Sequence, residues 1–129
     1  MELIEHGNLL EVMERISLNG WRFNDKDAAN MIKQILMALN YMHKQGVIHR
    51  DLKLENVMVD VEISEDGNAE LVCKLTDFGF ACVLDNDRKA SQKLGTVVYM
   101  APEIFMDEKY DEKVDTWALG VLTYVMLTG

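Results

Sequence analysis

The stretch His49-Arg50-Asp51-Leu52-Lys53-Leu54-Glu55-Asn56, followed later by Asp77-Phe78-Gly79, decides the fold and the chemistry expected of this 129-residue chain. The two segments place an aspartate, a lysine, an asparagine and a second aspartate in an order that suits phosphoryl transfer. That reaction requires little covalent chemistry from a protein. It depends on positioning and on cations that offset the charge of the transferring group.

Four side chains in these segments have the properties that such a reaction needs. Asp51 can accept the proton of an attacking hydroxyl, and Lys53 can neutralise the phosphoryl group in transit. Magnesium prefers oxygen ligands, which the Asn56 amide and the Asp77 carboxylate supply. We therefore predict Asp51, Lys53 and Asn56 as catalytic residues, and Asn56 and Asp77 as metal ligands.

Five motifs of the chain resemble those of the eukaryotic protein kinase catalytic domain. Residues 49–56 match the catalytic loop H-R-D-L-x-x-x-N, and residues 77–79 match the metal-binding D-F-G. Further along, Ala101-Pro102-Glu103 matches the A-P-E that closes the activation segment. Residues 95–100 resemble the substrate-docking loop, and Asp115-x-Trp117-x-x-Gly120 resembles the start of the large buried C-lobe helix. The motifs occur in the family's order, and the resemblance covers essentially the whole chain.

The resemblance implies transfer of the ATP γ-phosphate, with Mg²⁺, to a serine or threonine hydroxyl of a protein substrate. Lys53, two residues after Asp51, and the pair Gly95-Thr96 follow the serine/threonine pattern. The general layout, including residues 110–113, is most similar to the calcium- and calmodulin-regulated kinases. Glu55 is a candidate for contacting a basic substrate residue.

The resemblance also implies a nucleotide site. Its implied residues are Glu2, Ile4, Asn8, Lys53, Glu55, Asn56, Met58 and Asp77. Glu2 and Ile4 would offer backbone groups to adenine from the hinge between the kinase lobes. Asn8 would lie near the ribose, and Met58 would lie beneath adenine.

Sequence patterns predict an α+β fold of the kinase C-lobe type, mainly α-helical with short β-hairpins. Apolar residues at helical spacing indicate a helix near residues 9–16, and Asn24 can cap a second helix that Gly46 ends. Residues 57–61 and 71–75 read as strands joined by a turn at residues 66–68. Residues 114–127 are apolar nearly all round, which is typical of a buried helix. Asp115 can cap that helix or, as in the family, hold the catalytic-loop backbone.

The chain contains no Gly-rich loop and no V-A-I-K lysine, which belong to the kinase N-lobe. We therefore expect residues 1–129 to form one partial kinase domain, from the hinge to the large buried helix. Such a chain alone is expected to be inactive and poorly soluble or molten. The alternative is a non-catalytic, kinase-like interaction module, because ATP would be poorly clamped. An α-rich binding protein unrelated to kinases is a third, weaker hypothesis.

Composition restricts partners and location. The formal net charge of −9 argues against non-specific nucleic-acid binding. Two cysteines and no signal-peptide pattern indicate a reducing, cytoplasmic setting. No apolar run is long enough to cross a bilayer.

Residues 77–103, the activation segment by resemblance, show little periodicity. Ser91 is the best candidate for phosphorylation, which would give Arg50 an anionic partner. The family's usual phosphoacceptor position falls on Gln92, however, so a segment that is ordered without phosphate is an equal alternative. We expect His49 to pack under Phe78, and Thr96 to bond near Asp51.

Overall fold

The computed structural model describes residues 7–20, 22–63, 66–87, 89–106 and 109–129. In chain order, the α-helices and β-strands are α1 (Leu9–Leu18), α2 (Asp25–Lys44), β1 (Val47–Ile48), β2 (Val57–Ile63), β3 (Ala69–Leu75), β4 (Cys82–Val83), α3 (Pro102–Phe105) and α4 (Lys113–Thr128). Three short 3₁₀ turns, η1 (Leu54–Asn56), η2 (Phe78–Phe80) and η3 (Val97–Tyr99), lie in the connections. The fold is α+β, mainly helical with two small antiparallel sheets, one of which is the predicted hairpin.

Asparagine side chains begin the first two helices. The Asn8 carboxamide oxygen accepts the Glu11 amide at 3.0 Å, and the Glu11 carboxylate accepts the Asn8 amide at 3.1 Å, which forms a capping box. Asn24 accepts the amide of Asp27 at 2.8 Å. The predicted helix starts are therefore confirmed, and their cause is the satisfaction of otherwise unpaired amides.

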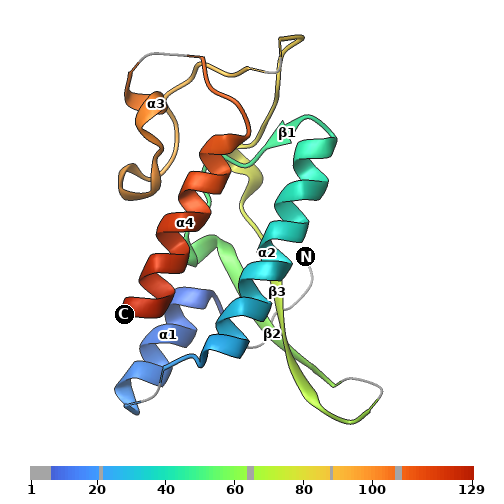
Figure 1. Cartoon of the computed structure of the whole chain (residues 1–129), viewed down its shortest axis with the longest axis vertical. Coiled ribbons are helices and arrows are strands. Elements are labelled where there is room, and N and C mark those ends of the chain that lie inside the picture. Colours follow the sequence, from blue (N-terminus) through green and yellow to red (C-terminus); the bar gives the residue numbers. More distant parts are fainter. Residues whose placement is uncertain (1–6, 21, 64–65, 88, 107–108) are drawn as a thin grey trace.

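The main core lies between α2, α4 and the first residues of the β2 strand, and α2 and α4 run side by side along the molecule (Figure 1). Its buried residues include Met31, Ile35 and Leu39 of α2 and Leu119 and Leu122 of α4. The same core takes in Leu52 and Leu54 from the catalytic loop. The loop is therefore packed against α2 and α4 through these two side chains.

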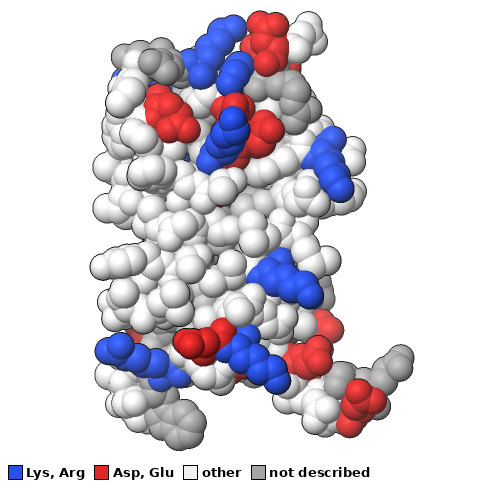
Figure 2. Space-filling model, in the orientation of Figure 1, with Lys and Arg blue, Asp and Glu red and all other residues white. Residues whose placement is uncertain are grey.

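The buried face of α4 is narrower than predicted. On α2, Leu36 and Met37 are exposed. On α4, Trp117 and Tyr124 are exposed, because only one face of the helix meets the core. Figure 2 shows a broad band almost free of charged side chains across this side of the molecule. The exposed Leu36, Met37, Trp117 and Tyr124 show that the described residues include exposed apolar surface.

The β2–β3 hairpin is longer than predicted, with pairs running from Val57–Leu75 to Ile63–Ala69 around the turn at residues 66–68. A second, two-residue pairing joins β1 to β4. The first hairpin brings the end of the catalytic loop and the start of the D-F-G segment to one end of the same ribbon. Among the described residues, no helix combines the length and apolar character that a bilayer span requires.

Candidate active site

The catalytic loop is suspended from helix α4. The Asp115 carboxylate accepts the backbone amides of His49 and Arg50, each at 2.9 Å, and also contacts His43 Nε2 at 2.8 Å. Asp115 is buried. Of its two expected roles, capping is wrong, because α4 begins at Lys113 with Glu112 at the cap position. Its role in holding the loop backbone is confirmed. These bonds fix the position of the backbone directly before Asp51.

His49 is a packing residue, as predicted. Its ring lies 5.3 Å from that of Phe78, centroid to centroid, at a tilt of 57°. Its Nε2 contacts the carbonyl of Thr76 at 3.1 Å, and its Nδ1 accepts the Asp51 amide at 3.3 Å. These partners assign the neutral tautomer with the proton on Nε2. The buried ring therefore connects the catalytic loop to the D-F-G segment.

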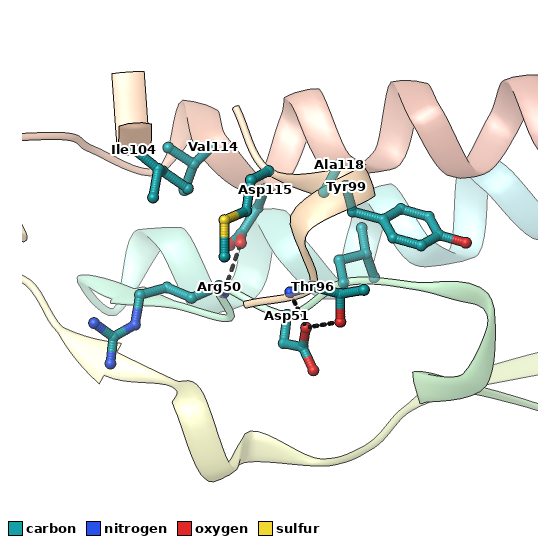
Figure 3. Close-up of a pocket in the computed structure, with 10 residues that line it drawn as sticks. Arg50, Asp51, Thr96, Tyr99, Ile104, Val114, Asp115 and Ala118 are labelled. Atoms are coloured by element: carbon teal, nitrogen blue, oxygen red, sulfur yellow. Dashed lines mark hydrogen bonds between the residues drawn. The ribbon is translucent and has the colours of Figure 1, made fainter. Parts of the chain in front are cut away.

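Asp51 is held by three neighbours. Its Oδ1 accepts the amide and the hydroxyl of Thr96 at 2.8 and 2.7 Å, and Figure 3 shows Thr96 reaching it from the activation segment. Its Oδ2 lies 3.1 Å from Lys53 Nζ and 3.2 Å from Asn56 Nδ2. The small cavity behind the loop, about 10 Å³, is a packing gap too small for a ligand.

The charge state of Asp51 follows from these contacts. Burial alone would raise the pKa of this carboxyl group. The hydrogen bonds from Thr96 and Lys53 and the positive charge of Lys53 outweigh burial, so the pKa of Asp51 lies below its usual value. The side chain is therefore an ionised acceptor at neutral pH. The contact of Lys53 Nζ with Thr96 Oγ1 at 3.1 Å joins all three side chains.

A glycine allows Thr96 to approach the loop. Gly95 has a φ of +123°, and a Cβ atom there would lie 2.4 Å from the Arg50 carbonyl oxygen. Any other residue would clash with the backbone that carries Asp51 and would be strained as well. The Gly95-Thr96 pair seen in the sequence is therefore a requirement of this close contact.

The predicted metal ligands lie at the same end of the hairpin. The backbone amide of Thr76 donates to the Asn56 carbonyl at 2.9 Å, so Asn56 and Asp77 are near neighbours across the ribbon. Asn56 directs its amide nitrogen to the carbonyl and carboxylate of Asp51. This orientation leaves its oxygen as the atom suited to a metal.

Asp77 has an unusual backbone conformation. With Arg50, it is one of the two described non-glycine residues at positive φ, at 58°. Such conformations cluster at functional sites. The described residues contain no cluster of three or more His, Cys, Asp or Glu side chains able to hold a metal. One carboxylate and one amide suit Mg²⁺, which takes few protein ligands when phosphates complete its coordination.

The remaining predicted nucleotide residues are only partly described. Glu2 and Ile4 lie outside the described residues. Asn8 forms a β-bridge with Met58, so the structure brings these two together, although the Asn8 carboxamide oxygen is used in capping α1. Glu55 lies within the catalytic loop and is exposed.

Sequence reasoning missed two polar contacts that support the site. Thr76 donates through its amide and its hydroxyl to the Asn56 carbonyl. Gln34 of α2 contacts both the Leu71 carbonyl, at 2.7 Å, and the Cys73 amide, at 2.8 Å, on the outer edge of β3. Both contacts join residues at least twenty positions apart, and no local pattern marks them.

Comparisons with known proteins agree with this geometry. The family model described as the protein kinase domain matches residues 1–129. Calcium-dependent protein kinase 4 of Plasmodium berghei is 42% identical over 108 residues, 84% of this chain and 20% of its own length. A probable myosin light chain kinase of Dictyostelium discoideum is 39% identical over 129 residues, all of this chain and 31% of its own length. A serine/threonine-protein kinase of Candida albicans is 39% identical over 130 residues, all of this chain and 12% of its own length. The chain thus spans between about a tenth and a third of these relatives.

Proposed function

The chain belongs to the protein kinase family, and from this premise we propose that it carries the catalytic loop and metal-binding motif of a serine/threonine protein kinase. The reaction is transfer of the ATP γ-phosphate to a serine or threonine hydroxyl of a protein. The observation that carries the proposal is the arrangement around Asp51. An ionised carboxylate, an ammonium group and an amide meet at the end of a hairpin whose other strand leads to Asp77.

We assign the proton-accepting role to Asp51 Oδ2. Oδ1 already accepts two short bonds from Thr96, whereas Oδ2 has longer contacts with Lys53 and Asn56. A base must lie within hydrogen-bond reach of the substrate hydroxyl, and a positioned base typically contributes 10²–10⁴-fold to the rate. Thr96 holds the carboxylate in place and joins the site to the segment that would receive the peptide.

We assign Asn56 Oδ1 and the Asp77 carboxylate to Mg²⁺ of the Mg²⁺–ATP complex. When bound, Mg²⁺ offsets the negative charge of the phosphates. Lys53, whose Nζ lies between Asp51 and Thr96, would contact the γ-phosphate. For the adenosine, Asn8 and Met58, joined by their β-bridge, are the described candidates, and Glu2, Ile4 and Glu55 stay as predictions. The domain extent, residues 1–129 as part of a kinase domain, and the cytoplasmic location are proposals of the same kind.

The serine/threonine class is supported by the Lys53–Thr96 contact and by the names of the relatives. The net charge of −9 argues against nucleic acid as a partner. Relatives of several serine/threonine kinase types share about 40% identity with the chain. Regulation by calcium therefore stays a prediction.

The test compares the full-length gene product with its Asp51→Asn variant in phosphate transfer from ATP to a serine/threonine peptide library. Asparagine keeps the shape but loses the base, so kcat should fall ~10²–10⁴-fold, or ~3–5 kcal/mol at the barrier. Asp25→Asn makes the same change at an exposed position and should leave the rate unchanged. Full turnover in Asp51→Asn would overturn the assignment of the base. Nucleotide binding without any transfer in the unmodified protein would favour the kinase-like interaction module.

A further inference from the structure

The guanidinium group of Arg50 is directed away from Asp51 and into the activation segment (Figure 3). Its Nε donates to the Phe80 carbonyl. Its Nη1 donates to the Gln92 carboxamide oxygen at 3.2 Å and lies 3.5 Å from the Tyr110 hydroxyl. Among the described residues, no carboxylate forms an ion pair with this buried arginine. The described hydrogen-bond partners of Arg50 Nε and Nη1 are therefore neutral oxygens.

Tyr110 fixes the same part of the segment from the other side. Its hydroxyl donates to the Gln92 carbonyl, and its ring is buried in a cluster with Ile104 and Val114. Its backbone amide and carbonyl pair with those of Ala90, both at 2.8 Å. Residues 90–92 are thus attached to Tyr110 by backbone and side-chain bonds together.

An ion pair extends this attachment by one residue. Lys89 Nζ lies 2.9 Å from the Asp111 carboxylate. The Lys89 hydrogen bond lowers the pKa of Asp111, and the Asp111 partner raises that of Lys89. Both groups are therefore charged at neutral pH. A segment held at Lys89, Ala90 and Gln92 has lost conformational freedom that a phosphate would otherwise have to offset.

We propose that Arg50, Gln92 and Tyr110 form a neutral lock, which orders the activation segment without phosphorylation. The proposal rests on the kinase function above and names how the same site is regulated: Gln92 supplies the acceptor that a phosphorylated residue would supply. Ser91 is exposed and makes no bond to Arg50 in the described structure. Its phosphorylation is therefore not required for order.

The first experiment uses the full-length gene product after treatment with a protein phosphatase, with mass spectrometry to establish that residues 77–103 carry no phosphate. Peptide phosphorylation and amide hydrogen exchange are then measured. The rate should stay within ~2-fold of that of the untreated protein, and the Ala90 amide should be protected because it donates to Tyr110. A loss of ~10-fold or more that re-phosphorylation of Ser91 restores would overturn the lock.

Variants separate the lock from general stability. Gln92→Ala removes the acceptor at an exposed position, so the fold should survive, while exchange at Ala90 should rise and activity should fall, each by ~10-fold. Gln92→Glu keeps a side-chain oxygen acceptor at this position, so its Ala90 exchange and its activity should both match those of the unmodified protein. Ser91→Ala is the matched control and should change neither. Equal Ala90 exchange in Gln92→Ala and the unmodified protein would contradict the lock.

The exchange measurement does not depend on catalysis. If no form of the protein phosphorylates any peptide, the proposed function fails, and the Ala90 amide still decides whether Gln92 orders the segment. If transfer occurs but only with phosphate on the segment, the function stands and the lock fails. The two outcomes are therefore distinguishable in one set of samples.

Discussion

The catalytic loop and the D-F-G turn lie at the same end of the β2–β3 hairpin but are held in different ways. In the loop, His49, Asp51 and Asn56 are buried and bonded to several parts of the fold. In the turn, Phe78 is 52% exposed, and the Asp77 carboxylate accepts an amide only from Gly79, at 3.2 Å, among the described contacts. The protein thus fixes Asp51, the proposed base, through its own contacts, whereas Asp77, a proposed metal ligand, has few contacts among the described residues.

If this contrast is right, damage to the loop should first cost stability, and damage to the turn should first cost ligand binding. The largest effect is expected at Asp115. Asp115→Ala leaves the amides of His49 and Arg50 without their acceptor in a buried site, which should destabilise the fold by ~3–5 kcal/mol. Thermal or urea unfolding of the full-length protein measures this change.

The control for that variant lies on the same helix. Thr116 is exposed, so Thr116→Ala should change stability by less than ~0.5 kcal/mol. Equal stability of the Asp115→Ala variant and the unmodified protein would mean that α4 does not support the catalytic loop.

The second prediction concerns the turn. Asp77→Asn should weaken binding of a Mg²⁺–ATP analogue by at least ~10-fold, because a charged oxygen ligand is lost. Its unfolding midpoint should move little, since the carboxylate is exposed. Calorimetric titration with the analogue and thermal unfolding of the same samples give both quantities. Asp87→Asn is the exposed control, and a large loss of stability in Asp77→Asn would erase the contrast between loop and turn.

A smaller effect is expected at the support of the hairpin itself. Gln34→Ala removes two hydrogen bonds to the open edge of β3, which should cost ~1–3 kcal/mol of stability. Asn40→Ala, an exposed position of the same helix, should be nearly neutral. Similar values for the two variants would show that α2 does not hold the strand that leads to Asp77.

The smallest effect is chemical and tests how closely that strand packs. Burial raises the pKa of Cys73 to about 11, from an ordinary value of 9.0. The thiolate fraction at pH 8 should then be ~100-fold lower than for an unperturbed thiol. In a Cys82→Ser background, disulfide-exchange labelling should be slow at pH 8, quicken as the pH approaches 11, and be fast in urea. If the folded protein is labelled as fast as the protein in urea, Cys73 is not buried on β3 as the structure shows.

Much of the fold was predictable because its signals are local. Asn24 caps the helix that it was expected to cap, and the turn at residues 66–68 joins the expected strands. The contact between His49 and Phe78 followed from a family pattern. These features depend on neighbours in sequence or on motifs of fixed spacing.

The rest depends on residues that meet only in three dimensions. Gln34 meets β3 across 37 positions, and Tyr110 meets Gln92 across 18. The start of α4 was predicted to within one residue, but its cap was not, because Asp115 is a good capping residue by type and its use as a backbone acceptor is visible only once the loop is positioned. Similarly, the apolar sequence of α4 does not say which of its faces, such as that of Trp117, meets the core.

The central claim is that Asn56 and Asp77 hold one metal–nucleotide complex beside Asp51. A double-mutant cycle with Asn56→Ala and Asp77→Ala, measuring affinity for Mn²⁺–ATP and for metal-free ATP in the full-length protein, tests it most directly. We predict that the two losses in Mn²⁺–ATP affinity are strongly non-additive, with metal-free binding little changed. Independent losses, or equal losses with and without metal, would contradict the account.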